Sequence, residues 1–294
     1  MDDLMQYEPE NNFYRSLPGL HAFRLLILEP GHVSQPVSIR LQVVERATAP
    51  AYDAISYVWG DPKIRILWAD AICINQSDLP ERSNQVMFMG SLYSNASKVY
   101  ICKGEARDGN DFHVQTVLND AITLGPSSLP LLPDNHPIRN DWRWYALGIL
   151  MESPWFSRTW VVQEAALANE SIVLYGRAEF GYRNLVTVVR YLNSSTWAIK
   201  FILSASLIHI EWADWRVNVH GPAYSDKVYA FLGHPLAYPL TGTNLVRPDY
   251  RKTPAQVYLE LSKALIQQTG LRVLTTVEHN QATILEDFPS WVTR

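Results

Sequence analysis

The sequence predicts an α/β fold in which a mainly parallel sheet is flanked by helices. The main observation is the order of patterns between residues 52 and 102. There the strand-like runs "YDAISYVW" and "RILWADAIC" are followed by a helical run, "ERSNQVMFMGSLYSNA", and by a further buried strand, "KVYIC". Strands that alternate with a helix in this way form α/β units. A second observation is size, because 294 residues, 47% of them hydrophobic, supply enough apolar material for a large core.

The elements before this unit predict an N-terminal β-hairpin. Residues 1–19 read as a polar leader, and strands are expected at 23–28 and 37–44. The segment "EPGHVSQP" between them contains the Pro and Gly of a turn.

The helix that follows the second strand pair carries its own start signal. Ser77 or Asp78 is the expected N-cap, and Pro80 and Glu81 fall in the first turn. One face of the helix is formed by Val86, Met89, Gly90 and Tyr93 and is largely apolar.

The rest of the chain predicts more helices and one strand. Helices are expected at 111–124, at 182–218 and at 253–270, the last with Thr253 as cap and Gly270 at its end. Two further helices are divided at Ser153-Pro154, a strand covers 171–176, and 125–137 reads as a loop. We therefore expect three parts: the leader at 1–19, an α/β core at 20–180 and a helical C-terminal part at 181–294.

The link between the first two α/β strands is unusually short, running roughly from Gly60 to Arg65. Parallel neighbours need a crossover of about a dozen residues or more, usually a helix. The sequence thus predicts that the first crossover is missing. The strands would be antiparallel, or the first would lie elsewhere, or a segment has been lost from the chain. We expect a destabilised domain with exposed apolar surface.

Composition narrows the classes of function. A net charge of −4 and a pI near 6.1 argue against nucleic acid or an anionic membrane as the main partner. Cys73 and Cys102 are far apart and are expected in the core of a protein from a reducing compartment. No signal peptide and no apolar run near 20 residues is visible, so a cytoplasmic protein is expected. The eight histidines are scattered and predict no metal site.

Three polar clusters are the candidate sites. The first is the end of the first α/β strand, where ligands bind in open sheets, with Ser56, Tyr57, Trp59 and Asp61. The second is the second strand and its exit, where a buried Asp needs a partner, with Asp70, Asn75 and Gln76. The third is the segment "SRTWVVQEAAL", expected to be two helical turns, with Arg158, Trp160, Gln163 and Glu164.

Glu164 is the leading catalytic candidate among these residues. Trp160 lies four positions before it, on the same helical face. A carboxylate half-buried beside an indole would have a raised pKa, as catalytic carboxylates often do. The alternative is structural: Trp160 packs in the core, and Glu164 pairs with Arg158 or caps a loop.

Several motifs, taken in order, resemble the fungal heterokaryon incompatibility (HET) domain family. They are "FRLLILEPG", "YDAISYVWGDP", "LWADAICINQSDLPERSNQVMFMGSLYSNASKVYICKG", "SPWFSRTWVVQEAALANESIVLYG", "SDKVYAFLG", "PDYRKTPAQVY" and "PSWV". The resemblance runs from about residue 20 to the end of the chain. It departs from the family after "WGDP", where HET domains normally carry some tens of residues, including a helix.

The resemblance implies a cytosolic effector of fungal non-self recognition, a form of innate immunity that ends in programmed cell death. The family is also similar to Toll/interleukin receptor (TIR) domains, which implies a TIR-like (flavodoxin-like) sheet. In TIR enzymes that cleave NAD, a W-x-x-x-E motif carries the catalytic glutamate; here it corresponds to Trp160 and Glu164. NAD would then be a substrate, with no cofactor, while Trp59 or Tyr57 stacks on a base and Asp61 lines the ribose pocket.

Three functions stay open on the sequence alone. The first is an enzyme-like effector that acts on NAD or a related nucleotide. The second is an interaction or self-assembly module that triggers death through an unknown protein partner, and the third is a degenerate, inactive copy.

Overall fold

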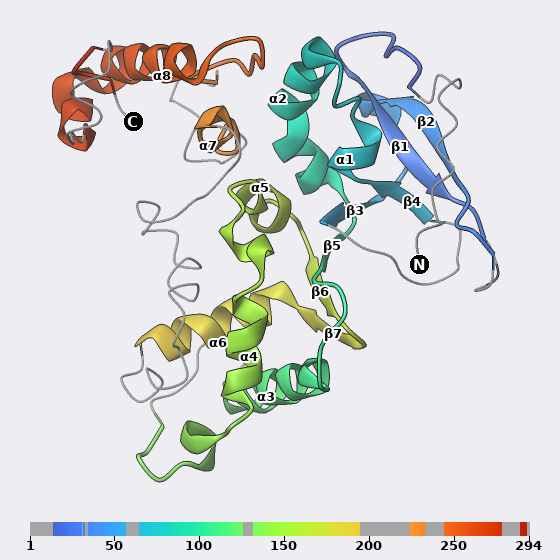
Figure 1. The fold of residues 1–294 in the computed structure, drawn as a ribbon, viewed down its shortest axis with the longest axis vertical. Helices are drawn as coiled ribbons and strands as arrows, with labels where there is room; N and C mark the ends of the chain where they lie inside the picture. Colours follow the sequence, from blue (N-terminus) through green and yellow to red (C-terminus); the bar gives the residue numbers. More distant parts are fainter. Residues whose placement is uncertain are drawn as a thin grey trace.

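The computed structural model describes residues 14–30, 32, 35–56, 65–125, 132–194, 224–232, 244–277 and 289–292. Within them lies a seven-stranded mixed sheet in the order β2-β1-β4-β3-β5-β6-β7 (Figure 1). The strands are β1 (Ala22–Leu28), β2 (Ile39–Glu45), β3 (Asp53–Ser56), β4 (Arg65–Trp68), β5 (Val99–Cys102), β6 (Ser171–Tyr175) and β7 (Ala178–Gly181). The central strands β4, β3, β5 and β6 are parallel, and antiparallel strands flank them on both sides. The α/β architecture predicted from the sequence is confirmed.

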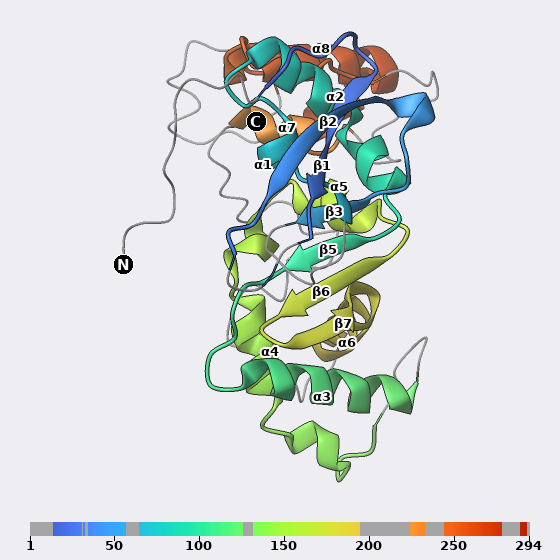
Figure 2. The same cartoon turned by 90° about the vertical axis from the view of Figure 1, so that its right-hand side faces the viewer.

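Helices pack mainly against one face of this sheet. They are α1 (Asp70–Cys73), α2 (Leu79–Asn95), α3 (Asn110–Leu124), α4 (Trp144–Met151), α5 (Val161–Ala166), α6 (Tyr182–Ser194), α7 (Tyr224–Tyr229) and α8 (Pro254–Thr269). In Figure 2 the strands face the viewer and α1, α2, α4, α5 and α6 lie behind them. Ala54, Ile101 and Val173 point to the helical side and are fully buried, whereas their neighbours Ile55 and Ile172 are half-buried.

The two strands joined by the short link are parallel neighbours, so the expectation of an antiparallel or displaced pair is wrong. Asp53 pairs with Leu67 and Ala54 with Trp68, so the start of β3 lies beside the end of β4. In this register the chain must run back along the strand direction by about five residue positions, or about 17 Å, to get from Ser56 to Arg65. The eight intervening residues can span about 28 Å, so the strands are short enough to be joined without a helix.

Asp70 does not lie in a strand, contrary to the prediction of one strand over 65–73. β4 ends at Trp68, and Asp70 begins the short helix α1, with its carboxylate accepting a hydrogen bond from the Ala71 backbone N–H at 2.8 Å. A short apolar run does not by itself distinguish a strand from a buried helical turn. The interruption by Asp70 therefore marks the start of a helix.

The helix that follows is confirmed down to its cap. The Asp78 carboxylate accepts from the backbone N–H of Glu81 at 3.0 Å, and the predicted apolar face of α2 is buried.

In contrast, Arg158 and Trp160 precede the helix in which they were expected. Pro154–Ser157 form a separate 3-10 turn, Arg158 has an extended backbone with ψ 130°, and Trp160 is the N-cap of α5. The predicted break at Ser153-Pro154 is confirmed, but the second segment is itself divided.

A buried ion pair joins β1 to the start of α2. The Arg24 guanidinium binds both carboxylate oxygens of Glu81, at 2.5 and 2.9 Å, and donates to the carbonyls of Cys73 and Arg15. Exposed fractions of the two side chains are 1% and 9%. Nothing in the sequence pattern flagged this pair.

The C-terminal helices pack on α2 and α5 through a second, smaller core. Val86 of α2 belongs to the same hydrophobic cluster as Val228, Tyr229 and Leu232 in and after α7 and Val257 of α8. Strand β7 and helix α7 were not predicted. The helix at 253–270 is confirmed as α8, with a capping box at Thr253 and Gly270 at φ +66°. No helix in the described ranges is long and apolar enough to cross a membrane.

Candidate functional site

The side chain of Glu164 lies at the carboxyl end of β3, where it meets Ser56. The Ser56 hydroxyl donates to Glu164 Oε2, and it accepts a hydrogen bond from the indole N–H of Trp155 at 2.5 Å. All three residues are buried, with Glu164 and Ser56 only 1% and 2% exposed. The sheet end, the 3-10 turn and α5 therefore supply one residue each to a short hydrogen-bond chain.

Local folding explains why these groups meet. Because side chains alternate along a strand, Ser56 points to the same face as the buried Ala54, which is the face that α5 covers. Trp155 is held against the rings of Phe156 and Tyr182 by edge contacts at 5.0 and 6.0 Å between centroids. Its indole N–H is thus fixed in position above the end of β3.

The surroundings of Glu164 raise the pKa of its carboxyl group overall. Burial raises the pKa of the Glu164 carboxyl, while Arg158 lowers it and Asp70 raises it. The Arg158 guanidinium lies 3.4 Å from Glu164 Oε1 and is 37% exposed, so this ion pair links the buried carboxylate to the protein surface. A carboxyl group tuned in this way suits proton transfer or stabilisation of a developing positive charge.

Two further polar residues, Asp70 and Tyr93, lie near the hydrogen-bond chain of Trp155, Ser56 and Glu164. Asp70, at the start of α1, is close enough to act electrostatically on both Glu164 and Tyr93. The Tyr93 hydroxyl is fully buried and has no hydrogen-bond partner among the described residues. Burial is also the main reason that the pKa of Tyr93 lies well above its usual value.

The structure brings together only part of the predicted site. Ser56, Asp70, Arg158 and Glu164 gather as described, whereas Tyr57, Trp59 and Asp61 lie outside the described residues. Sequence reasoning missed Trp155 and Tyr93. Trp155 falls inside the family motif "SPWFSRTW", which was the available signal, but Tyr93 was assigned only to the core face of its helix.

The remaining predicted residues have structural contacts. Asn75 accepts a hydrogen bond from the Ser77 N–H, and Gln76 donates to the Asp70 carbonyl, so both shape the turn between α1 and α2. Gln163 donates to the carbonyls of Tyr229 and Ala230, at 3.1 and 2.7 Å, and ties α5 to α7. Trp160 is half-buried and packs against both hydrophobic cores.

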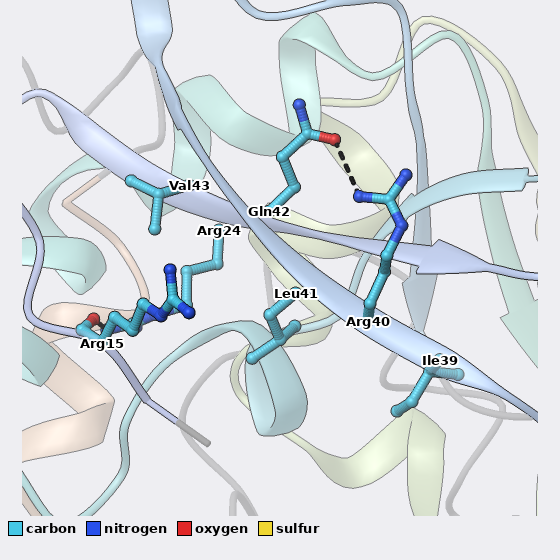
Figure 3. Close-up of a pocket in the computed structure, with 7 residues that line it drawn as sticks. All are labelled: Arg15, Arg24, Ile39, Arg40, Leu41, Gln42 and Val43. Atoms are coloured by element: carbon cyan, nitrogen blue, oxygen red, sulfur yellow. Dashed lines mark hydrogen bonds between the residues drawn. The ribbon is translucent and has the colours of Figure 1, made fainter. Parts of the chain in front are cut away.

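A pocket of about 640 Å³ is lined mainly by residues of β2 (Figure 3). Two of its arginines already have carboxylate partners, because Arg24 binds Glu81 and Arg40 binds Glu29 at 2.9 Å and reaches Gln42. Its lining residues are Arg15, Arg24, Ile39, Arg40, Leu41, Gln42 and Val43. These residues do not form a centre for chemistry.

The described residues contain no group of three or more His, Cys, Asp or Glu side chains that could hold a metal ion. Both cysteines are buried as free thiols, which confirms their predicted place in the core. Burial raises the pKa of each thiol to about 12, so neither is poised as a nucleophile.

Comparison with known proteins finds a match to one family. Residues 62–164 match the model of the heterokaryon incompatibility protein (HET) family, and this range ends at Glu164. Over this segment the chain is similar to HET proteins. The chain is also 24% identical, over 308 aligned positions, to "Heterokaryon incompatibility protein 6, OR allele" of Neurospora crassa. That alignment covers 77% of this chain and 44% of the relative, so the chain spans less than half of the relative's length. No solved structure matches the chain.

Most of the site lies within the range that matches the HET model. Asp70, Tyr93, Trp155, Arg158 and Glu164 all lie inside residues 62–164. Ser56, which donates to Glu164, precedes the matched range. The site therefore combines a HET segment with a strand that comes before it.

Proposed function

We propose that this HET-type protein is an effector of fungal non-self recognition that promotes programmed cell death by cleaving NAD. The observation that carries the proposal is the buried carboxylate of Glu164, bonded to Ser56 at the carboxyl end of a parallel strand. This edge of an α/β sheet is where nucleotide ligands bind. The family resemblance to proteins of heterokaryon incompatibility supports the biological role.

The reaction is hydrolysis of the bond between nicotinamide and C1′ of ribose. Nicotinamide leaves with the bonding electron pair, water adds to C1′, and one proton is released with ADP-ribose. The transition state carries positive charge on the sugar, so an ionised carboxylate nearby lowers its energy. Glu164 supplies that charge, and the ribose hydroxyls take the places of Ser56 and Arg158 as its hydrogen-bond donors.

Access to Glu164 passes by Arg158. The carboxylate is 1% exposed while its ion-pair partner is 37% exposed, so Arg158 covers the entry and must swing aside when the sugar binds. Because burial raises the pKa of Glu164, its ionised form is lost as the pH falls through that raised pKa. Nicotinamide release should decline over the same pH range.

Nicotinamide release by the purified protein, measured by chromatography, tests the proposal. Glu164→Gln keeps the shape of the side chain and removes its charge, so release should fall by about 10²–10³-fold. Glu170→Gln is the matched control, because Glu170 is an exposed glutamate paired with Lys98, and its activity should stay at the wild-type level. Full activity in Glu164→Gln would remove Glu164 from the catalytic role.

The second candidate is a non-enzymatic interaction or self-assembly module. The pairing of buried Glu164 with Arg158 favours this candidate, because a purely structural ion pair would also be buried and paired in this way. Expression of each variant in a fungal host separates the two. Death that persists with Glu164→Gln supports the interaction module. Wild-type protein that neither releases nicotinamide nor causes death is the degenerate copy.

A further inference from the structure

Lys103 is a half-buried lysine that packs against Trp155 of the Glu164 site. It follows β5 directly, and its backbone N–H donates to the Leu174 carbonyl at 2.8 Å, so it extends the sheet ladder. Its ammonium nitrogen lies 5.0 Å from the ring centroid of Trp155 and 4.6 Å from that of Phe156. Trp155 is the same residue that donates to Ser56, so Lys103 and Ser56 flank one indole.

The Lys103 ammonium has aromatic neighbours but no carboxylate partner among the described residues. No carboxylate of the described residues lies within ion-pair distance of the Lys103 ammonium, and its charged or titratable neighbours are Arg158 and Cys102. The rings of Trp155 and Phe156 carry no charge. Burial lowers the pKa of Lys103 to about 7, and repulsion from Arg158 lowers it as well. Of these two neighbouring basic residues, only Arg158 has a carboxylate partner, Glu164.

A buried, unpaired ammonium group is costly for a fold to keep. A lysine packed against apolar side chains usually keeps its charged end fully in water or pairs it with a carboxylate. The described surroundings of Lys103 contain neither arrangement, whereas an anionic ligand would supply the missing charge. Arg and Lys together are the usual donors to phosphate oxygens, the first as a planar fork and the second as a point charge.

We propose that Lys103 and Arg158 form an anion-binding subsite that receives a phosphate or diphosphate group at the mouth of the Glu164 site. Naming the diphosphate of the substrate dinucleotide as that group rests on the proposed function, while the binding of a phosphoryl anion does not. The subsite would hold the diphosphate while the ribose bound to it reaches Glu164.

Chemical labelling tests the state of Lys103 in the intact protein. At pH 7 a lysine with pKa about 7 is half uncharged, compared with about one in 3,000 for an ordinary lysine. Brief treatment with acetic anhydride should therefore acetylate Lys103 well before Lys98, which lies at the other end of β5 and binds Glu170 at 3.2 Å. Inorganic pyrophosphate should protect Lys103 and leave Lys98 unchanged. Rapid labelling of Lys103 that pyrophosphate does not slow, or no preference for Lys103, would overturn the subsite.

Binding measurements separate this subsite from the proposed reaction. Lys103→Met and Arg158→Gln should each weaken pyrophosphate binding at least tenfold by calorimetry, and Lys98→Met should not change it. Lys103→Met should melt no lower than wild type, because it removes an unpaired buried cation. Thermal unfolding thus shows that lost binding is not lost folding.

The two hypotheses fail differently. If wild-type protein releases no nicotinamide but pyrophosphate binding depends on Lys103, the reaction is wrong and the subsite stands. If release depends on Glu164 while Lys103→Met changes neither pyrophosphate binding nor the ratio of activity on NAD to activity on nicotinamide riboside, the subsite is wrong. Nicotinamide riboside lacks the diphosphate, so the subsite predicts that this ratio falls in Lys103→Met.

Discussion

Breaking the ion pair between Arg24 and Glu81 should destabilise the fold more than any exposed pair does. The two side chains are 1% and 9% exposed, and Glu81→Gln would leave the buried guanidinium without its counter-charge. Removing one partner of a buried pair costs about 3–5 kcal/mol. Arg24 keeps hydrogen bonds to the carbonyls of Cys73 and Arg15, so the lower part of that range, about 3 kcal/mol, is expected for Glu81→Gln.

Urea unfolding followed by tryptophan fluorescence measures this free energy, and a double-mutant cycle isolates the pair. Arg24→Met with Glu81→Gln should cost at least about 2 kcal/mol less than the sum of the single changes, because no charge is then left unpaired. Arg40 and Glu29 provide the matched control, with exposed fractions of 58% and 38%, and their cycle should give about 1 kcal/mol or less. Additive single changes at Arg24 and Glu81, within about 0.5 kcal/mol, would refute the reasoning.

Two further changes test the fold. Gly176→Ala should lower the free energy of unfolding by about 2–4 kcal/mol, since φ is +57° and the new Cβ would lie 2.6 Å from Asp111 Oδ2. Gly104→Ala, at φ +73° with nothing within 4 Å of the new Cβ, should lower it by only about 1 kcal/mol. Equal losses in urea unfolding would argue against the close contact. Thr253→Ala removes a capping box and should cost about 1 kcal/mol, whereas Thr253→Ser should retain nearly all the stability; a loss that Ser does not rescue would contradict the cap.

Local signals in the sequence were sufficient to predict the elements that carry them. Asp78 and Pro80 start α2, and Thr253 and Gly270 delimit α8, because capping depends on residues within one turn. The 65–73 segment was misassigned because an apolar run without clear period fits both a strand and a helical turn. The rule on crossover length failed at β3 and β4 because it assumes strands of ordinary length, and each of these has four residues.

The sequence suggested several residues of the candidate site but none of the contacts between them. Glu164 and Ser56 were both expected to be functional, yet 108 positions separate them, and no local pattern links their side chains. Lys103 was missed because a lysine just after a strand is normally a solvated surface residue. Its burial arises from Trp155 and Phe156, which come from a distant turn.

The register between β3 and β5 also determines whether the site exists at all. Ser56 pairs with Ile101, and side chains on a strand alternate between the two faces. A slip of one residue would turn the Ser56 hydroxyl away and present Ile55, an apolar side chain, to Glu164. The hydrogen bond between Ser56 and Glu164 thus favours one strand alignment over its neighbours, so a contact in the candidate site also helps to specify the fold.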